Sequence, residues 1–420
     1  NTKLAFWTYP RLVKSFVKTK NGKRAGSKTF AQTPIAFFVT KIYFCGEITR
    51  HKMIIDTSID KTNFFFIKNW QKYLYKLIYE SKCTNRRINM NFCNQLLKLT
   101  KNSNIKIVFP EASFSDRTIK AVQKLKKLGV CEPLLIGDES SLVMQNKKLG
   151  KFNIINPKTS QLTEMLAQSL FDARKDKGLT LEEAKKLILN PHYFATMLVK
   201  CGYADGMVGG AEVSTKDNLK PALQLLKNEN SFVNSYTLIV GENGLTNNPF
   251  IMTDCGLIEN PTVEQLPVIA KRSADEYVAL TKIEPKIAFL SYSTYGSANS
   301  EATQKMSKAQ EIFKLNNRDI KSVGEVQLDS ALLKNVASQK MGEGKDFYGG
   351  ANVLVFPELN SANICYKAIS YFGKLYAIGP ITVGLKKPVN DLSRGATVMD
   401  IVYLTAITVL QCKKEKEWKY

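Results

Sequence analysis

The chain has 420 residues, of which 44% are hydrophobic and 23% are charged. These are values of globular proteins, and the length allows two or three domains. The net charge of +23 is uneven, because residues 1–89 hold 18 basic and four acidic residues, a net of +14, and the rest carries +9. Since the larger part is only moderately basic, an anionic small substrate suits it as well as a nucleic acid. We therefore do not expect a nucleic-acid partner.

The composition also argues against a metal site and against membrane association. The eight cysteines include no Cys-x-x-Cys pair, and His51 and His192 are the only histidines, so we expect no metal site. Scattered cysteines are typical of reduced thiols in a cytosolic protein. With so few histidines, acid–base chemistry is left mainly to carboxylates. No apolar run reaches the ~20 residues that a membrane span needs, so we expect no membrane association.

The first 89 residues differ from the rest. They are rich in Lys, Phe, Tyr and Asn and show no sustained helical or strand period. Three interpretations compete: a basic arm for nucleic acid or membrane, a targeting presequence, or an extension upstream of the true start. We favour the third, because Met90 is directly followed by a regular pattern. We assign this basic extension no fold.

An α/β pattern begins after Met90. The apolar run Ile105–Phe109 predicts a strand, the spaced apolar residues of Asp116–Gly129 predict a helix, and Pro133–Gly137 predicts a second strand. This strand–helix–strand order is typical of a parallel sheet covered by helices. Further helices are predicted over 165–177, from a capping box at 180–183, and over 191–202.

Two connections between a strand and a helix stand out. Ala204–Ala211 is a short strand ending in glycines, and Ser214 leads into the next helix; such glycines serve either close approach to a ligand or tight packing. In the second half, strands are predicted over 235–240, 250–253, 286–290 and 351–357. The strand Lys286–Leu290 runs into Ser291–Ala298, whose hydroxyls and glycine predict either a phosphate cradle or a hydrophilic turn.

A third polar stretch lies near the C-terminus. Pro388–Gly395 is rich in turn-forming residues, and Thr397–Asp400 has the spacing of a helix capping box. We expect a tight turn that enters a helix, with Arg394 at the turn and the Asp400 carboxylate in the first helical turn. Taken alone, these residues fit an anion site with a base beside it, or an ordinary capped helix with one solvated arginine.

From Met90 onward, the segments together resemble the phosphate acetyltransferase (phosphotransacetylase) family of phosphate acetyl/butyryltransferases. The matching segments, in chain order, are Ile107–Glu111, Ala204–Val208, Leu290–Ala298, Gly324–Asp329, Asn352–Asn360, Gly379-Pro380 and Lys387–Gly395. The last segment is the most specific in length and composition, and it favours the anion-site interpretation.

The resemblance implies an α/β fold with two α/β domains and a cleft between them, as in isocitrate and isopropylmalate dehydrogenases. Residues 90–232 with 386–420 would form one domain and residues 233–385 the other. It also implies a cytoplasmic homodimer with a functional link to acetate kinase.

The reaction implied is acetyl-CoA + phosphate = CoA + acetyl phosphate, by direct thiol attack in a ternary complex. CoA and acetyl phosphate are then substrates, and no cofactor is permanently bound. Asp400 matches the family's base, Arg394 its phosphate-binding arginine, and Ser393 the hydroxyl that orients the thiol. The predicted substrate-binding residues are Arg174, Lys220, Ser291, Ser293, Thr294, Gly296, Ser297 and Asn390. Lys220 stands where the family normally has arginine, so we expect weaker ligand binding there. Tyr295 stands where the family commonly has lysine, which removes one cation from the loop.

Two alternatives remain open from the sequence. A phosphate butyryltransferase runs the same chemistry on a longer acyl chain, and a domain of this fold can be non-catalytic. The joint presence of Ser393, Arg394 and Asp400 favours a catalytic protein.

Overall fold

The computed structural model describes residues 92–140, 152–228, 231–241, 248–373 and 375–417. The basic extension of residues 1–89, and the three interpretations of it, lie outside these ranges. Within them, no helix is both long and apolar enough to cross a membrane. The same ranges hold no cluster of His, Cys, Asp and Glu side chains arranged to bind a metal ion.

The first sheet has five strands in the order β11-β4-β1-β2-β3, and every pairing in it is parallel. Its strands are β1 (Lys106–Phe109), β2 (Glu132–Ile136), β3 (Asn153–Ile155), β4 (Gly206–Gly209) and β11 (Val389–Asp391). The strand β11 therefore comes from the C-terminal part of the chain and completes a sheet built by residues 106–209.

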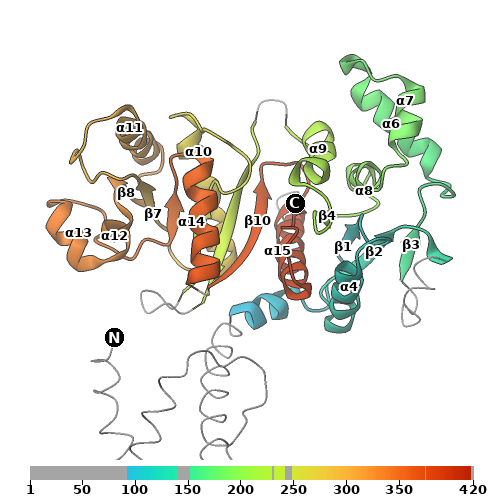
Figure 1. Ribbon diagram of the computed structural model, residues 1–420, viewed down its shortest axis with the longest axis horizontal. Helices are drawn as coiled ribbons and strands as arrows, with labels where there is room; N and C mark the ends of the chain where they lie inside the picture. The colour runs from blue at the N-terminus through green and yellow to red at the C-terminus, as the bar shows by residue number, and fades with distance from the viewer. Residues whose placement is uncertain (1–91, 141–151, 229–230, 242–247, 374, 418–420) are drawn as a thin grey trace, which may run out of the picture. The chain divides into compact units, whose positions relative to one another are not determined.

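Helices cover both faces of this sheet (Figure 1). Alternate side chains of a strand point to opposite faces, and Ile107 and Phe109 belong to one buried cluster while Val108 belongs to another. The first cluster contains α4 (Asp116–Leu128) and α15 (Val398–Glu417). The second contains α6, α7, α8 and α9. These are α6 (Thr163–Arg174), which continues into the 3₁₀ turn η2 (Lys175–Lys177), α7 (Leu181–Leu187), α8 (Pro191–Lys200) and α9 (Thr215–Leu225).

Local caps explain where these helices begin and end. Ser115 accepts a hydrogen bond from the Thr118 N–H, and α4 stops at Gly129, which has a φ of +68°. The predicted capping box of α7 is present, with Thr180 and Glu183 bonded reciprocally. The helices and strands predicted over residues 105–202 are confirmed to within two or three residues, and the helix predicted to begin at the capping box ends at Leu187.

The second sheet has six strands in the order β10-β5-β6-β9-β7-β8. Only β5 pairs antiparallel, with β6 and with β10. Its strands are β5 (Asn234–Val240), β6 (Phe250–Thr253), β7 (Lys286–Leu290), β8 (Lys321–Val326), β9 (Val353–Val355) and β10 (Tyr376–Val383). One face packs on α10 (Gln265–Thr281) and α11 (Glu301–Asn316), and the other on α12 (Leu328–Leu332), α13 (Lys334–Lys340) and α14 (Leu359–Phe372).

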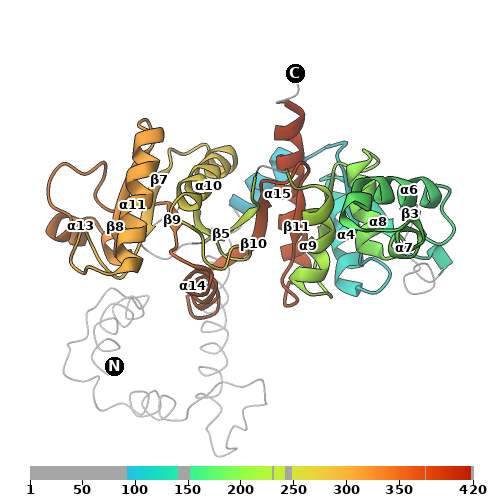
Figure 2. The same cartoon turned by 90° about the horizontal axis from the view of Figure 1, so that it is seen from above.

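The helix α15 connects the two sheets. Figure 2 shows α15 between β10 and α4, and it contacts both. The Gln411 amide donates to the Thr382 carbonyl of β10 at 3.1 Å, and Lys414 pairs with Glu276 of α10 at 3.0 Å. The predicted α/β fold class, with two α/β parts, is confirmed. The residue boundaries of two domains stay a prediction.

Candidate functional site

The stretch before Ser393 is a buried strand, which makes one prediction wrong. Asn390 and Asp391 were expected in a tight turn, but they lie in β11 opposite Val208 and Gly209 of β4. Their exposed fractions are 0% and 1%. Pairing within a sheet satisfies the backbone of these residues, so it overrides their preference for turns. The turn itself begins at Ser393, whose carbonyl accepts from the Ala396 N–H at 2.8 Å.

Arg117 holds this turn in place by hydrogen bonds to its backbone carbonyls. Its guanidinium donates to the carbonyls of Arg394 at 2.8 Å, Ala396 at 2.7 Å and Ala211 at 2.6 Å, and it pairs with the Glu212 carboxylate at 2.9 Å. It thus joins the Ser393 turn to the loop after β4, and the side chains of Ser393 and Arg394 stay exposed. Arg117 was not among the predicted site residues, although the sequence places it one residue into α4, just after β1.

Asp400 lies in the first turn of α15, as predicted. Its Oδ2 accepts from the Thr397 N–H at 2.6 Å, and its N–H donates to Thr397 Oγ1 at 3.3 Å, so the predicted capping box is confirmed. Tyr376 of β10 donates its hydroxyl to Asp400 Oδ1. Burial and then the bond to Asp400 raise the pKa of Tyr376, so the phenol remains a protonated donor. This partner from the other sheet was not predicted.

Asn390 is held by the protein itself. Its Oδ1 accepts from the Thr382 N–H at 2.8 Å, and its Nδ2 donates to Thr408 at 2.9 Å and to Gln411 at 2.8 Å. The side chain thus links β11, β10 and α15. Its predicted contact with substrate stays a prediction, and any such contact would compete with these bonds.

The start of α9 lies beside the end of β11. Ser214 caps α9 by accepting from the Asp217 N–H at 3.2 Å, as its place in the sequence indicates. Thr215 donates to Asp391 at 2.6 Å, which ties the helix to β11. Lys220, one of the predicted substrate-binding residues, is exposed on α9. Arg174 lies at the end of α6, and its charge partly offsets the burial that raises the pKa of Tyr193.

The loop Ser291–Ala298 donates hydrogen bonds to a buried carboxylate of the protein. Glu325, at the end of β8 and 4% exposed, accepts from Ser293 Oγ at 3.0 Å and from the Gly296 N–H at 2.8 Å. Thr294 exchanges hydrogen bonds with Gln327. Several donors of the expected phosphate cradle therefore point to protein acceptors. One signal of this is present in the sequence, because the charged Glu325 lies among the buried residues of β8.

Two other features mark this loop. Ser297 Oγ accepts from the Thr294 N–H at 3.0 Å, and Ser291 Oγ from the Ser293 N–H at 3.3 Å, so these hydroxyls also shape the turn. The Lys345 ammonium lies 3.6 Å from the centre of the Tyr295 ring, an ordinary cation–π distance. A cation thus stands next to Tyr295, where the sequence comparison predicted the loss of one.

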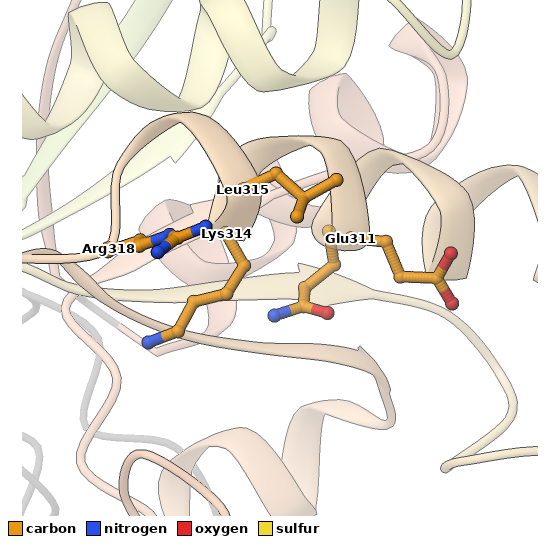
Figure 3. A pocket seen from close by; sticks show the side chains of 5 residues that line it. Glu311, Lys314, Leu315 and Arg318 are labelled. Carbon is orange, nitrogen blue, oxygen red and sulfur yellow. The ribbon is translucent and has the colours of Figure 1, made fainter.

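The structure therefore places the predicted residues in two groups, except Arg174, which lies at the end of α6. One comprises Ser393, Arg394, Asp400 and Asn390, with Lys220 on the adjoining α9. The other is the hydroxyl loop of the six-stranded sheet, whose side-chain bonds go to residues of that same sheet and its helices. A surface depression elsewhere, on α11, is lined by Gln310, Glu311, Lys314, Leu315 and Arg318 (Figure 3). It includes none of the predicted site residues.

Comparison with known proteins settles the family. Residues 91–409 match the model described as "Phosphate acetyl/butaryl transferase". The chain belongs to this family. A phosphate acetyltransferase of Acetivibrio thermocellus is 40% identical over 337 residues, which are 78% of this chain and 100% of that protein. One of Clostridium acetobutylicum is 39% identical, over 77% of this chain and 99% of that protein.

A solved structure agrees in fold. A phosphotransacetylase from Streptococcus pyogenes has a TM-score of 0.72 and 38% sequence identity, over 77% of this chain and 99% of that chain. The resemblance drawn from the sequence segments is thereby confirmed, and so is the assignment to the acyltransferases.

Proposed function

We propose that this chain is a phosphate acetyltransferase, which interconverts acetyl-CoA plus phosphate and CoA plus acetyl phosphate. Relatives with that name match it over their whole length. The proposal depends mainly on one observation. Ser393 and Arg394 are exposed in a single turn, and they lie seven and six residues before Asp400, whose carboxylate is held in the first turn of α15. No observation in the structure favours the butyryl or the non-catalytic alternative.

The chemistry assigns each of these groups a step. The CoA sulfur attacks the carbonyl carbon of acetyl phosphate, a C–S bond forms, the C–O bond to phosphate breaks, and phosphate leaves. Asp400 takes the thiol proton, because it matches the family's base and its carboxylate is held in the first turn of the helix that follows the Ser393 turn. Arg394 binds the phosphoryl oxygens with its planar guanidinium, which matches them in a bidentate way. Ser393 orients the thiol.

The remaining predicted substrate-binding residues complete the site in this proposal. They are Arg174, Lys220, Ser291, Ser293, Thr294, Gly296, Ser297 and Asn390, with CoA as a substrate and no permanently bound cofactor. Ser293, Thr294 and Asn390, whose side chains are buried and bonded to the protein, shape the site rather than line its surface. We further propose two domains, residues 90–232 with 386–420 and residues 233–385, and a homodimer functionally linked to acetate kinase. A cytoplasmic location is supported by the six cysteines of the described ranges, all of which are free thiols.

The decisive experiment is an acyl-transfer assay with purified full-length protein. Thioester formation is followed with CoA and either acetyl phosphate or butyryl phosphate, and kcat/KM is compared. We expect the acetyl substrate to be preferred. A preference for butyryl phosphate would refute the acetyl assignment, and a folded protein without turnover on either substrate would support the non-catalytic alternative.

A further inference from the structure

Asp391 carries a buried carboxyl group directly behind the Ser393 turn. Its exposed fraction is 1%. Thr215 Oγ1 donates to its Oδ2 at 2.6 Å, and Asn218 Nδ2 donates to its Oδ1 at 2.9 Å. Both partners lie in the first four residues of α9. The carboxylate thus fastens the start of α9 to the end of β11, two residues before Ser393.

The glycines of the loop after β4 make room for this group. A Cβ atom at Gly210, where φ is +95°, would lie 2.2 Å from Asp391 Oδ1. A Cβ atom at Gly209 would lie 2.4 Å from Asn218 Oδ1. Either distance is a severe overlap, so a side chain at these positions would displace the carboxylate or its amide partner. Of the two uses predicted for these glycines, close approach to a ligand and tight packing, the structure shows tight packing against Asp391 and Asn218.

The surroundings make this carboxyl costly to ionise. Burial, the largest cause, raises the pKa of Asp391 to about 6, and the bonds from Thr215 and Asn218 only partly offset it. The Glu111 carboxylate, after β1, repels it, and His192 of α8 acts in the opposite direction. The charge of Asp391 in turn helps to raise the pKa of the Tyr366 phenol, in α14.

A buried carboxylate lowers stability unless it is fully paired, and an amide or an apolar side chain would fill the space at less cost. Costly buried groups are often kept at functional sites, where they hold neighbouring groups in place. Asp391 sits between the two parts of the chain that carry the predicted cations, α9 with Lys220 and the turn with Arg394.

We propose that Asp391 is a positioning residue, whose carboxylate locks the start of α9 and the Ser393–Gly395 turn into one arrangement for binding the phosphoryl group. Because it acts through Thr215 and Asn218 rather than on substrate, it sets affinity more than chemistry. This inference rests on the proposed acetyl transfer and adds a residue to it.

The first test is Asp391→Asn, which keeps the volume but replaces one acceptor oxygen with a donor. We expect a folded protein whose KM for acetyl phosphate rises about tenfold, a larger change than the fall in kcat, because a charge-assisted hydrogen bond is lost. In the wild type, KM should also rise as the pH falls below about 6, while in the variant it should be insensitive to pH there. A variant with the wild-type KM and pH profile would overturn the proposal.

Glu276→Gln is the matched control. Glu276 is also buried and carries a charge paired with Lys414, but it lies on α10 of the other sheet. Removing this charge should leave the KM for acetyl phosphate unchanged. An equal rise in both variants would mean that loss of any buried charge disturbs the protein, which would contradict a specific role of Asp391.

A pair of Thr215 variants tests the same link with Asp391 intact. Thr215→Val removes the donating hydroxyl and should raise KM severalfold, and Thr215→Ser retains it and should keep the wild-type value. Equal behaviour of the two would overturn the proposal. If the wild type shows no turnover, the proposed function fails on its own. The pair is then compared by calorimetric titration with inorganic phosphate, where equal affinities would overturn the positioning role.

Discussion

Two connections from a strand into a helix look alike in sequence and differ in structure. Both the loop Ser291–Ala298 and the stretch Leu392–Thr397 are rich in hydroxyls and glycine, and both precede a capped helix. In the first, Ser293 is fully buried and bonded to Glu325. In the second, Ser393 and Arg394 are exposed, and the buried carboxylate, Asp391, binds α9 instead of the turn.

The difference shows what composition alone cannot specify. A polar loop becomes an anion site only if its donors are not already satisfied by the protein, because a buried donor normally has a partner. Around Ser393, the backbone carbonyls are bound by Arg117, which leaves the exposed side chains available to a ligand. We therefore assign catalysis to this turn and a mainly structural use to several hydroxyls of the other loop.

Among the variants that compare the two connections, the largest effect is expected of Arg394→Ala. Loss of the guanidinium removes a charge that stabilises the reacting phosphoryl group, so kcat/KM for acetyl phosphate should fall about 10²–10³-fold. The thermal midpoint should change little, because the side chain is exposed. Arg318→Ala, an exposed arginine at the end of α11, is the control and should retain wild-type kinetics. An Arg394 variant with wild-type kcat/KM would remove the turn from the mechanism.

The next effect is on the pH dependence of the free energy of unfolding, which the Asp391 carboxyl group influences. A folded pKa of about 6 against an ordinary value of 3.8 means that the native state binds more protons than the unfolded state between these values. The protonated carboxyl group therefore contributes to the free energy of unfolding at low pH. This contribution, up to about 3 kcal/mol, is lost as the pH rises through 6. Asn does not titrate.

The measurement is urea denaturation of the wild type and Asp391→Asn at pH 4.5 and pH 7.5. The free energy of unfolding of the variant, relative to the wild type, should be higher at pH 7.5 than at pH 4.5. A difference that is the same at both pH values would contradict the buried, costly carboxyl on which the positioning role depends.

The smallest expected effect is at Glu325, in the other connection. Glu325→Ala leaves the Ser293 hydroxyl and the Gly296 N–H without their acceptor, and the free energy of unfolding should fall by about 1–3 kcal/mol. Glu325→Gln keeps one acceptor oxygen and should lose less. Equal stability of the wild type and the Ala variant would show that these donors are free to bind a ligand, and the contrast between the two connections would disappear.

Much of the local structure follows from the sequence by simple physics. The capping boxes at Thr180 and Thr397 and the helix start at Ser300 depend on residues three positions apart, so their partners can be read from the chain. The strands β1, β2 and β7 are short apolar runs bounded by turn residues. The site residues, in contrast, were identified from the resemblance of sequence segments to the family, and not from the spacing of residues.

What escaped prediction depends on contacts between distant residues. Asn390 and Asp391 prefer turns locally, but pairing with β4, about 180 positions away in sequence, makes them a strand. Tyr376 and Glu325 lie in strands, and only the assembled sheets bring them to Asp400 and to the hydroxyl loop. The strand β8 was not predicted either, because Val323 and Val326 are its only apolar side chains and they do not follow the alternation of a strand.

Asp400→Asn tests the central claim most directly. Asn preserves the volume and one acceptor, so the capping contacts with Thr397 should largely persist and the variant should fold. We expect kcat for acetyl transfer to CoA to fall about 10²–10⁴-fold, because the proton acceptor for the thiol is lost. A folded variant with nearly wild-type kcat would show that Asp400 serves only as a helix cap, and that the thiol proton leaves by another route.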